Sequence, residues 1–200
     1  MPIKALFVTL IAVSAVFGPA LAADWGWFSG DVVATFLRDG RNMRIERPFT
    51  YVDPRGRTWD VPAGVVTDGA SVPQFFWVAF PPFTGQYRSA AVVHDHYCQS
   101  MSRSWRETHE VFYNAMRASD VDEITALTMY GAVYNFGPRW GIGAGRRGPG
   151  PDKYQTDAEQ QAFFRELRDW IAREKPSTAE IAKRLDAGGE VPKGSRRPLR

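Results

Sequence analysis

The sequence is poor in cysteine and in histidine, with one cysteine and three histidines among 200 residues. Because Cys98 is the only cysteine, no intramolecular disulfide can form, and packing must hold the fold together even in an oxidising compartment. We interpret Cys98 as a small, buried core residue, with a reactive thiol as the alternative. Seven tryptophans and thirteen phenylalanines are enough to fill the core of one domain.

Long apolar runs are absent beyond the N-terminus. Residues 1–22 are typical of an export signal, because Lys4 precedes the apolar run ALFVTLIAVSAVFG and the small residues of ALA follow it. An uncleaved anchor is the alternative, although an apolar run of about 14 residues is shorter than the roughly 20 that span a bilayer. We expect a cleaved signal peptide, a mature chain from about Ala23 without a transmembrane span, and a periplasmic or secreted location.

Most of the chain has little net charge of either sign. Residues 23–145 carry 11 Lys and Arg against 13 Asp and Glu, a net charge of −2, whereas residues 146–200 carry 13 against 9, a net charge of +4. The basic end, PKGSRRPLR, predicts either a solvated terminus or a contact with anionic phospholipid or the cell-envelope surface. Nucleic acid is not an expected partner.

The order of strand-like and helix-like segments predicts an α+β domain over residues 23–140. Its first part should be a small antiparallel β-meander, formed by DVVATFL at 31–37, MRIERPFTYVD at 43–53 and RTWDVPAGVV at 57–66. Proline removes a donor from the strand ladder, so Pro48 and Pro62 mark edges or strand ends.

A three-helix unit should follow the meander. The first helix is expected over residues 86–99, and Ser104 and Glu107 have the spacing of a capping box at the start of the second. Asp120 and Glu123 repeat that spacing for a third helix, which should end at Gly137.

The C-terminal part should be a helical tail joined by a linker. The linker is the glycine-rich stretch GIGAGRRGPGPDK at 141–153, and residues 154–200 form the basic tail. Helical spacing predicts that one face of the tail is apolar. That face carries Phe163, Phe164, Leu167, Trp170 and Ile171.

All three histidines lie within residues 94–109. At about 100° per residue, His94 shares a helix face with Cys98, whereas His96 lies about 200° away and is expected at the surface. His109 should face inward from the next helix, so antiparallel packing would bring His94 and His109 within reach of each other. The two are either hydrogen-bonded core histidines or, with Asp95 beside them, a functional site.

The stretch TDGASVP, residues 67–73, precedes these helices. Asp68 and Gly69 form a common turn pair, in which the aspartate is either a turn former or a ligand. Ser71 is better placed to cap a helical turn than to act as a nucleophile, because GAS lacks the strand-turn-helix context of a nucleophile elbow.

Several motifs resemble the bacterial and phage domain-of-unknown-function 1353 family. They are VPAGVVTDGASVP, AAVVHDHYC and MYGAVYNFG, found in the family's order from about Phe36 to Gly137. The resemblance implies a shared fold and a prokaryotic or prophage context, and it implies no established activity.

A more distant resemblance is to the small secreted prokaryotic phospholipases A2, through a loop carrying Asp-Gly, a helix carrying His-Asp and a second helix with an inward-facing polar residue. It implies that His94 is a general base acting on water, and that Asp95 and the Asp68-Gly69 loop bind Ca²⁺. His109 stands where those enzymes carry the acid that orients the histidine. This departure leaves a Zn²⁺ site of His94, Asp95 and His109 as the alternative.

Together these features predict an exported protein with a His-Asp site, formed by catalytic His94 and His109 and by the metal ligands Asp95, Asp68 and Gly69. Its predicted activity is metal-dependent hydrolysis of a lipid or an ester, in the manner of a phospholipase A2. The alternative is a non-catalytic interaction module, associated with the envelope or derived from a phage.

Overall fold

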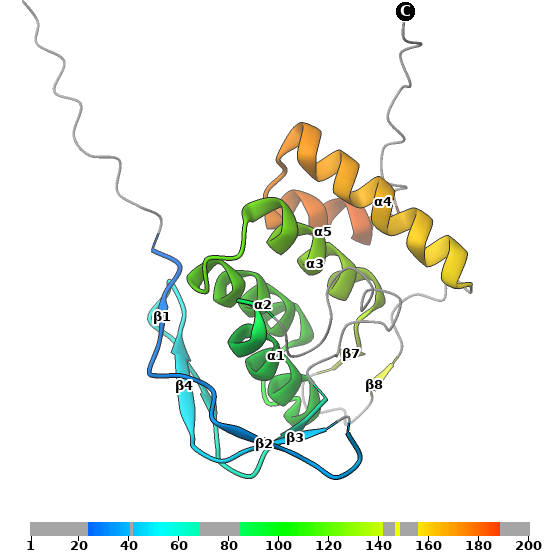
Figure 1. Ribbon diagram of the computed structural model, residues 1–200. Helices are drawn as coiled ribbons and strands as arrows, with labels where there is room; N and C mark the ends of the chain where they lie inside the picture. The colour runs from blue at the N-terminus through cyan, green and yellow to red at the C-terminus, as the bar shows by residue number, and fades with distance from the viewer. Residues whose placement is uncertain (1–23, 41, 69–84, 142–146, 149–155, 189–200) are drawn as a thin grey trace, which may run out of the picture.

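The computed structural model describes residues 24–40, 42–68, 85–141, 147–148 and 156–188. Short strands come first along the chain and helices follow, as Figure 1 shows by colour. The predicted export signal and most of the predicted linker lie outside the described residues. The strands are β1 (Trp27–Phe28), β2 (Ala34–Phe36), β3 (Met43–Ile45), β4 (Phe49–Val52), β5 (Thr58–Val61), β6 (Val66–Thr67), β7 (Arg139–Trp140) and β8 (Arg147–Gly148), and the helices are α1 (Arg88–Ser100), α2 (Trp105–Ala118), α3 (Glu123–Phe136), α4 (Asp157–Glu174) and α5 (Thr178–Asp186).

The α+β prediction is confirmed, and its strands form two small antiparallel sheets where one meander was expected. One sheet has the order β1-β4-β5 and the other β2-β3-β6, while β7 pairs with β8. Each of the two longer extended runs contributes one strand to each sheet. The breaks fall at Pro48 and Pro62, where proline cannot continue the ladder. Gly64, with φ +87°, then turns the chain so that its N–H donates to the carbonyl of Ile45 at 2.7 Å.

The helices stack in layers away from the sheets. In Figure 1, α1 and α2 lie between the strands and α3, and α4 and α5 cover the far side of α3. Because α3 is enclosed by both helix pairs, ten of its fourteen residues are buried. Gly131 permits the close approach of the last layer, since a Cβ at this position would lie 2.8 Å from Cδ2 of Leu167.

The helix starts follow side-chain capping. The capping box of Ser104 and Glu107 forms as predicted, with both reciprocal hydrogen bonds. The third helix begins two residues later than expected, because Asp122 and not Asp120 caps it by accepting a hydrogen bond from the N–H of Thr125. Asp120 has a left-handed backbone, with φ +59°, and belongs to the turn before the helix.

The C-terminal helices dock on the domain through the predicted apolar face. Phe163, Leu167, Trp170 and Ile171 are buried, and Phe164 is partly buried. A polar contact secures α5, since the Arg106 guanidinium binds both carboxylate oxygens of Asp186 at 2.8 and 3.2 Å. Within the described ranges, no helix combines the length and the apolar character needed to cross a bilayer.

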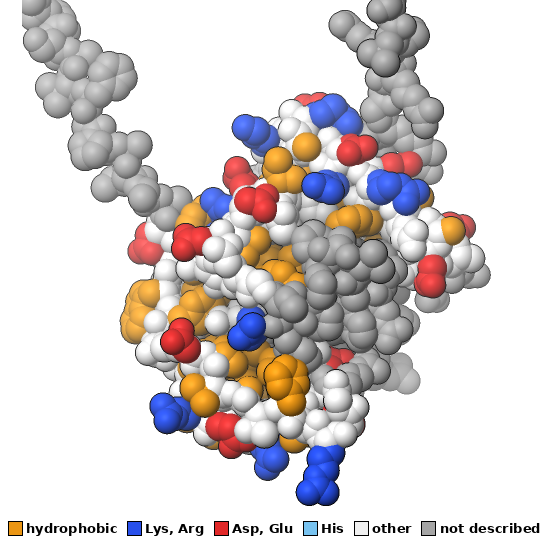
Figure 2. Space-filling view, in the orientation of Figure 1, with side chains coloured by type: hydrophobic (Ala, Val, Ile, Leu, Met, Phe, Trp, Pro, Cys, Tyr) orange, Lys and Arg blue, Asp and Glu red, His pale blue; other side chains and the backbone are white. Residues whose placement is uncertain are grey.

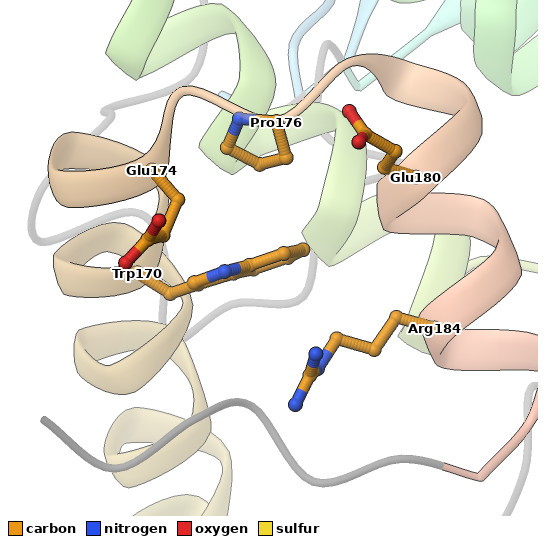
Figure 3. Close-up of a pocket in the computed structure, with 5 residues that line it drawn as sticks. All are labelled: Trp170, Glu174, Pro176, Glu180 and Arg184. Atoms are coloured by element: carbon orange, nitrogen blue, oxygen red, sulfur yellow. The ribbon is translucent and has the colours of Figure 1, made fainter.

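An open pocket of about 400 Å³ lies between α4 and α5. Figure 3 shows Trp170 and Glu174 projecting from α4 and Arg184 and Glu180 from α5, with Pro176 in the connection between the helices. The Arg184 guanidinium carbon lies 5.2 Å from the centre of the Trp170 ring. The guanidinium of Arg184 therefore already occupies the position beside the Trp170 ring that an external cation would take.

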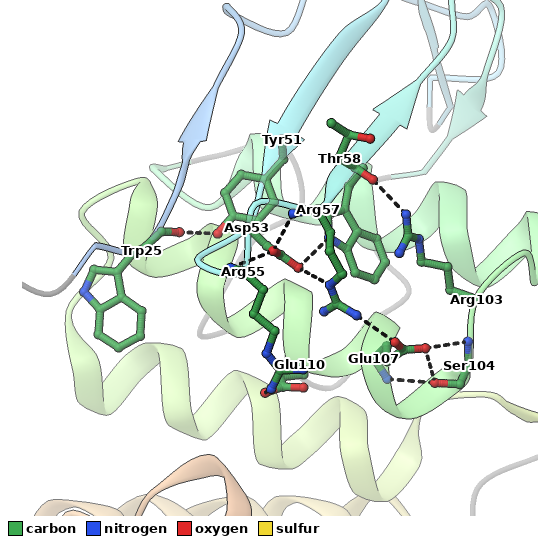
Figure 4. A network of polar contacts seen from close by, with 11 residues as sticks. Trp25, Tyr51, Asp53, Arg55, Arg57, Thr58, Arg103, Ser104, Glu107 and Glu110 are labelled. Atoms are coloured by element: carbon green, nitrogen blue, oxygen red, sulfur yellow. Dashed lines mark hydrogen bonds and ion pairs between the residues drawn. The ribbon is translucent and has the colours of Figure 1, made fainter.

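A buried carboxylate joins the first sheet to α2. Asp53 accepts hydrogen bonds from the backbone N–H groups of Arg55 and Arg57, from Nε of Arg57 and from Nε1 of Trp59, at 2.8 to 3.0 Å. Arg57 in turn donates to Glu107 of α2 at 2.7 Å, as Figure 4 shows. Burial alone would raise the pKa of Asp53, but the hydrogen bonds from Trp59 and Arg57 outweigh it and lower that pKa.

Candidate functional site

The structure brings His94 of α1 and His109 of α2 into direct contact. Nε2 of His94 lies 2.9 Å from Nδ1 of His109, a hydrogen-bonding distance. The contact forms because α1 and α2 pack together through the faces that carry these residues. Both side chains are buried, with exposed fractions of 1% and 0%.

Cys98 is the third member of this group, and it was predicted as a core residue with a reactive thiol as the alternative. It follows His94 by one helical turn, so both side chains lie on the same face of α1. Its Sγ lies 3.6 Å from Nε2 and 3.9 Å from Nδ1 of His94. One potential ligand atom from each of His94, Cys98 and His109 lies within 4.8 Å of the other two. We call these three residues the His/Cys cluster.

Asp95 lies beside the cluster. Its Oδ1 is 3.9 Å from Nδ1 of His94, and its Oδ2 accepts a hydrogen bond from Oγ1 of Thr67 on β6. Asp95 and Thr67 are both buried, so the end of the second sheet holds this carboxylate against α1. Asp95 therefore contacts the ring nitrogen of His94 that points away from His109.

The remaining predicted residues are placed as follows. Asp68 comes directly after β6 and is half-buried. Gly69 and Ser71 lie outside the described residues. His96, predicted at the surface, is half-buried and its ring packs against Tyr97, with ring centres 5.1 Å apart.

Aromatic rings enclose the two histidines. The ring of Phe112 lies 4.8 Å from that of His94, and the rings of Trp105 and Trp140 lie 5.6 and 6.3 Å from that of His109, between ring centres. Figure 2 shows no histidine surface among the described residues on the face that it presents. The cluster is therefore an enclosed group of ionisable side chains within an apolar setting.

The end of α3 closes the site on the side of His109. A Cβ at Gly137 would lie 3.0 Å from both Cε1 and Nε2 of His109, so the absence of a side chain lets the imidazole fit. Nε2 of His109 is buried and forms no hydrogen bond of standard geometry with the described residues. The backbone of Pro138 lies close enough to this imidazole to favour its protonated form.

The surroundings shift the pKa values of the two histidines in opposite directions. Burial lowers the pKa of His94, but Cys98 and Asp95 outweigh this effect and raise the pKa to about 9. For His109, burial and the charges of His94 and Arg139 all act to lower the pKa, and it falls well below the usual value. The surroundings therefore favour the protonated imidazolium at His94 and the neutral imidazole at His109.

The predicted calcium ligands, Asp95, Asp68 and Gly69, are not members of the His/Cys cluster, and calcium does not fit the cluster itself. Ca²⁺ takes roughly six to eight oxygen ligands. The cluster instead offers two imidazole nitrogens and one sulfur. The neighbouring Asp95 carboxylate is directed at Thr67 and His94.

Comparison with known families finds a match over the part of the chain that contains this site. Residues 43–133 match the family described as Protein of unknown function (DUF1353). The matched segment runs from β3 into α3 and includes all three residues of the His/Cys cluster. The predicted resemblance to DUF1353 is thus supported over the part of the chain that contains the site.

Two curated proteins are also similar to this chain. The chain is 42% identical over 125 residues to the uncharacterized protein y4jT of Sinorhizobium fredii (strain NBRC 101917 / NGR234), a match that covers 60% of this chain and 37% of that protein. It is also 42% identical over 108 residues to the uncharacterized protein y4iH of the same strain, covering 52% of this chain and 44% of that protein. The chain therefore spans less than half the length of either relative.

No solved structure matches the chain. The family match and the two relatives give no support to the phospholipase A2 resemblance, since neither the family description nor the names of the relatives state an activity. The functional argument therefore depends on the side chains of the site itself.

Proposed function

We propose that the protein is an exported hydrolase that acts on ester or lipid substrates at the His/Cys cluster. The supporting observation is that two imidazoles and one thiol lie within 4.8 Å of one another. Imidazoles are the side chains that most often transfer protons in hydrolysis, and a neighbouring imidazole is the usual activator of a thiol. The location in the periplasm or outside the cell follows from the predicted export signal.

Within this proposal, the two histidines transfer protons and Asp95 positions one of them. His94 and His109 exchange a proton across their 2.9 Å contact, so together they can give a proton to a leaving group and take one from water. Asp95 fixes the orientation of His94 from the opposite ring nitrogen, and Thr67 fixes Asp95. Asp95 is thus a positioning residue.

The test is hydrolysis by the purified full chain of mixed phospholipid vesicles and of a series of aryl esters. We expect His94→Gln and His109→Gln each to reduce the rate by about 100-fold or more, which is the usual loss when a proton-transfer group is removed. His96→Gln is the matched control, because His96 lies on another face of α1, and it should retain the wild-type rate. Wild-type levels of hydrolysis in His94→Gln, with retained circular dichroism, would contradict the proposal.

A second candidate, a non-catalytic envelope module, is favoured by the burial of the site. The exposed fractions of His94, Cys98 and His109 are 1%, 0% and 0%, so a substrate would reach them only after part of the structure moves. Such a module would use its basic C-terminus to contact anionic lipid.

Removal of residues 189–200 tests the second candidate. This segment carries four Lys and Arg against one Glu. A longer truncation at residue 145 would also remove α4 and α5, which cover α3, and would expose apolar core. We expect the shorter truncation to reduce co-sedimentation with phosphatidylglycerol vesicles by about 10-fold or more at low salt, since each basic residue contributes about 1 kcal/mol. Unchanged co-sedimentation would exclude this segment as the contact surface.

A further inference from the structure

We propose that the His/Cys cluster is a zinc-type metal site, with Nε2 of His94, Nδ1 of His109 and Sγ of Cys98 as the ligands. The proposal goes beyond hydrolysis and does not depend on it. A zinc ion here could act as the cofactor of a hydrolase, and it could equally stabilise the fold of a non-catalytic module.

The types of donor atom select the metal. Zn²⁺ is commonly bound by imidazole nitrogen and thiolate sulfur, whereas Ca²⁺ and Mg²⁺ require oxygen ligands. The cluster supplies two imidazoles and one thiol. Its composition therefore matches Zn²⁺ and related late transition metals, among which metal availability also determines occupancy.

The distances already approach those of a tetrahedral ion. Bond lengths of about 2.3 Å to sulfur and about 2.05 Å to nitrogen place a sulfur and a nitrogen ligand about 3.6 Å apart, and two nitrogen ligands about 3.4 Å apart. The distance from Sγ of Cys98 to Nε2 of His94 is 3.6 Å. The distance from Nε2 of His94 to Nδ1 of His109 is 2.9 Å, so these two nitrogens would have to separate by about half an ångström, and all three ligand atoms lie within 4.8 Å of one another.

In both histidines, the ring nitrogen that is not a proposed ligand is also placed as in known metal sites. A metal-bound histidine usually directs its second ring nitrogen to a carboxylate or a backbone carbonyl, which fixes the ring. Nδ1 of His94 faces the carboxylate of Asp95 at 3.9 Å, and Thr67 holds that carboxylate. Nε2 of His109 is buried, forms no standard hydrogen bond with the described residues, and lies beside the Pro138 backbone.

This arrangement assigns Asp95 a role different from the predicted one. We infer that Asp95 orients His94 as a partner of the ligand, and that Cys98 takes the ligand position which the alternative zinc site gave to Asp95. The three ligands would leave the fourth tetrahedral position for water or another group, as in catalytic zinc sites.

The decisive experiment uses cobalt in the metal-free full chain. Co²⁺ bound to a thiolate gives an intense near-ultraviolet charge-transfer band, and Cys98 is the only cysteine in the chain. We therefore expect one equivalent of Co²⁺ to produce this band and one equivalent of Zn²⁺ to abolish it, while excess Ca²⁺ has no effect. Absence of the band in folded wild-type protein at saturating Co²⁺ would overturn the proposal without the use of any variant.

Competition with a chromophoric chelator then measures the Zn²⁺ affinity of matched variants. We expect Cys98→Ser, His94→Gln and His109→Gln each to bind at least about 100-fold more weakly than wild type, and His96→Gln to bind as wild type. Asp95→Asn should bind about 10- to 100-fold more weakly yet keep the cobalt band, because it affects an outer contact only. Wild-type affinity in Cys98→Ser, or equal losses in His96→Gln, would contradict the assignment.

The outcomes separate this inference from the proposed function. Zinc binding at the cluster without hydrolysis would remove the hydrolase proposal and keep the metal site. Hydrolysis that is unaffected by removal of metal, combined with no cobalt band, would contradict the metal site and leave the hydrolase proposal in place.

Discussion

Asp53→Ala should lower the free energy of unfolding by about 4 kcal/mol, as is typical when one partner of a buried ionic contact is removed. The variant leaves Nε of Arg57, Nε1 of Trp59 and two turn N–H groups without their acceptor. Trp59 is fully buried, so its indole N–H has no access to bulk water as a replacement. Urea unfolding at pH 7 measures the loss.

Asp60→Ala is the matched control for this prediction. Asp60 lies in β5, the strand that follows the turn carrying Asp53; it is exposed, and its carboxylate accepts a hydrogen bond from Oγ1 of Thr50 at 2.6 Å. Its removal should cost about 1 kcal/mol or less. Equal losses in the two variants would mean that Asp53 has no special structural role.

The contribution of Asp53 should also depend on pH. The folded protein lowers the pKa of Asp53 below its value in the unfolded chain, so the folded state favours the ionised form. The stabilisation is therefore fully present above the unfolded pKa of about 3.9 and is lost as the pH falls through the folded pKa. The difference in stability between wild type and Asp53→Ala should accordingly shrink below about pH 4. A difference that stays constant down to pH 2 would refute this account.

Gly137→Ala should destabilise the protein by about 2 to 3 kcal/mol, the usual cost of forcing a methyl group into packed space. The added Cβ would overlap the carbonyl oxygen of Val133 and lie 3.0 Å from two ring atoms of His109. The backbone at the end of α3 or the imidazole must therefore move. Thermal and urea unfolding of the variant measure the cost.

The same substitution provides a probe of the site. Gly30→Ala is the matched control, because a Cβ at Gly30 would meet nothing within 4 Å. We expect Gly137→Ala to change the ring-proton NMR signals of His109 and Gly30→Ala to leave them in place. Unchanged stability and unchanged His109 signals in Gly137→Ala would contradict the close packing at this end of α3.

The pairing of the two histidines could be predicted from the sequence because it depends on local regularity. Helical periodicity places His94 and His109 on inward faces, and a capping box fixes where the second helix begins. Adjacent helices of this kind usually pack antiparallel, so the contact follows. The periodicity also placed Cys98 on the face of His94, but a lone cysteine in an apolar context gave no reason to prefer a ligand to a core residue.

The division of the strands into two sheets could not be predicted, because it depends on pairing between distant segments. Pro48 and Pro62 indicate that the runs are interrupted, but they do not indicate which sheet each half will join. Asp53 illustrates the same limit. Its sequence context is that of an ordinary turn, and its importance arises from Trp59 and from Glu107, which lies 50 residues beyond Arg57 in the chain.

The start of α3 shows how a local signal can remain ambiguous. Both Asp120 and Asp122 are followed three residues later by a residue suited to a helix start, Glu123 and Thr125. The left-handed backbone of Asp120, with φ +59°, determines which of them caps the helix. Such a backbone conformation depends on how the preceding helix ends, and the spacing pattern does not contain that information.

Only residues 101–104 separate α1 from α2, so the His/Cys cluster lies within sixteen consecutive residues. The entropy lost in closing so short a loop is small, and contacts of low sequence separation tend to form early in folding. The helical hairpin that holds the cluster can therefore assemble before the two sheets pair and before α4 and α5 dock. If the proposed metal site forms at this early stage, the hairpin would capture a metal ion while the rest of the domain is still open, and the domain would then fold around it.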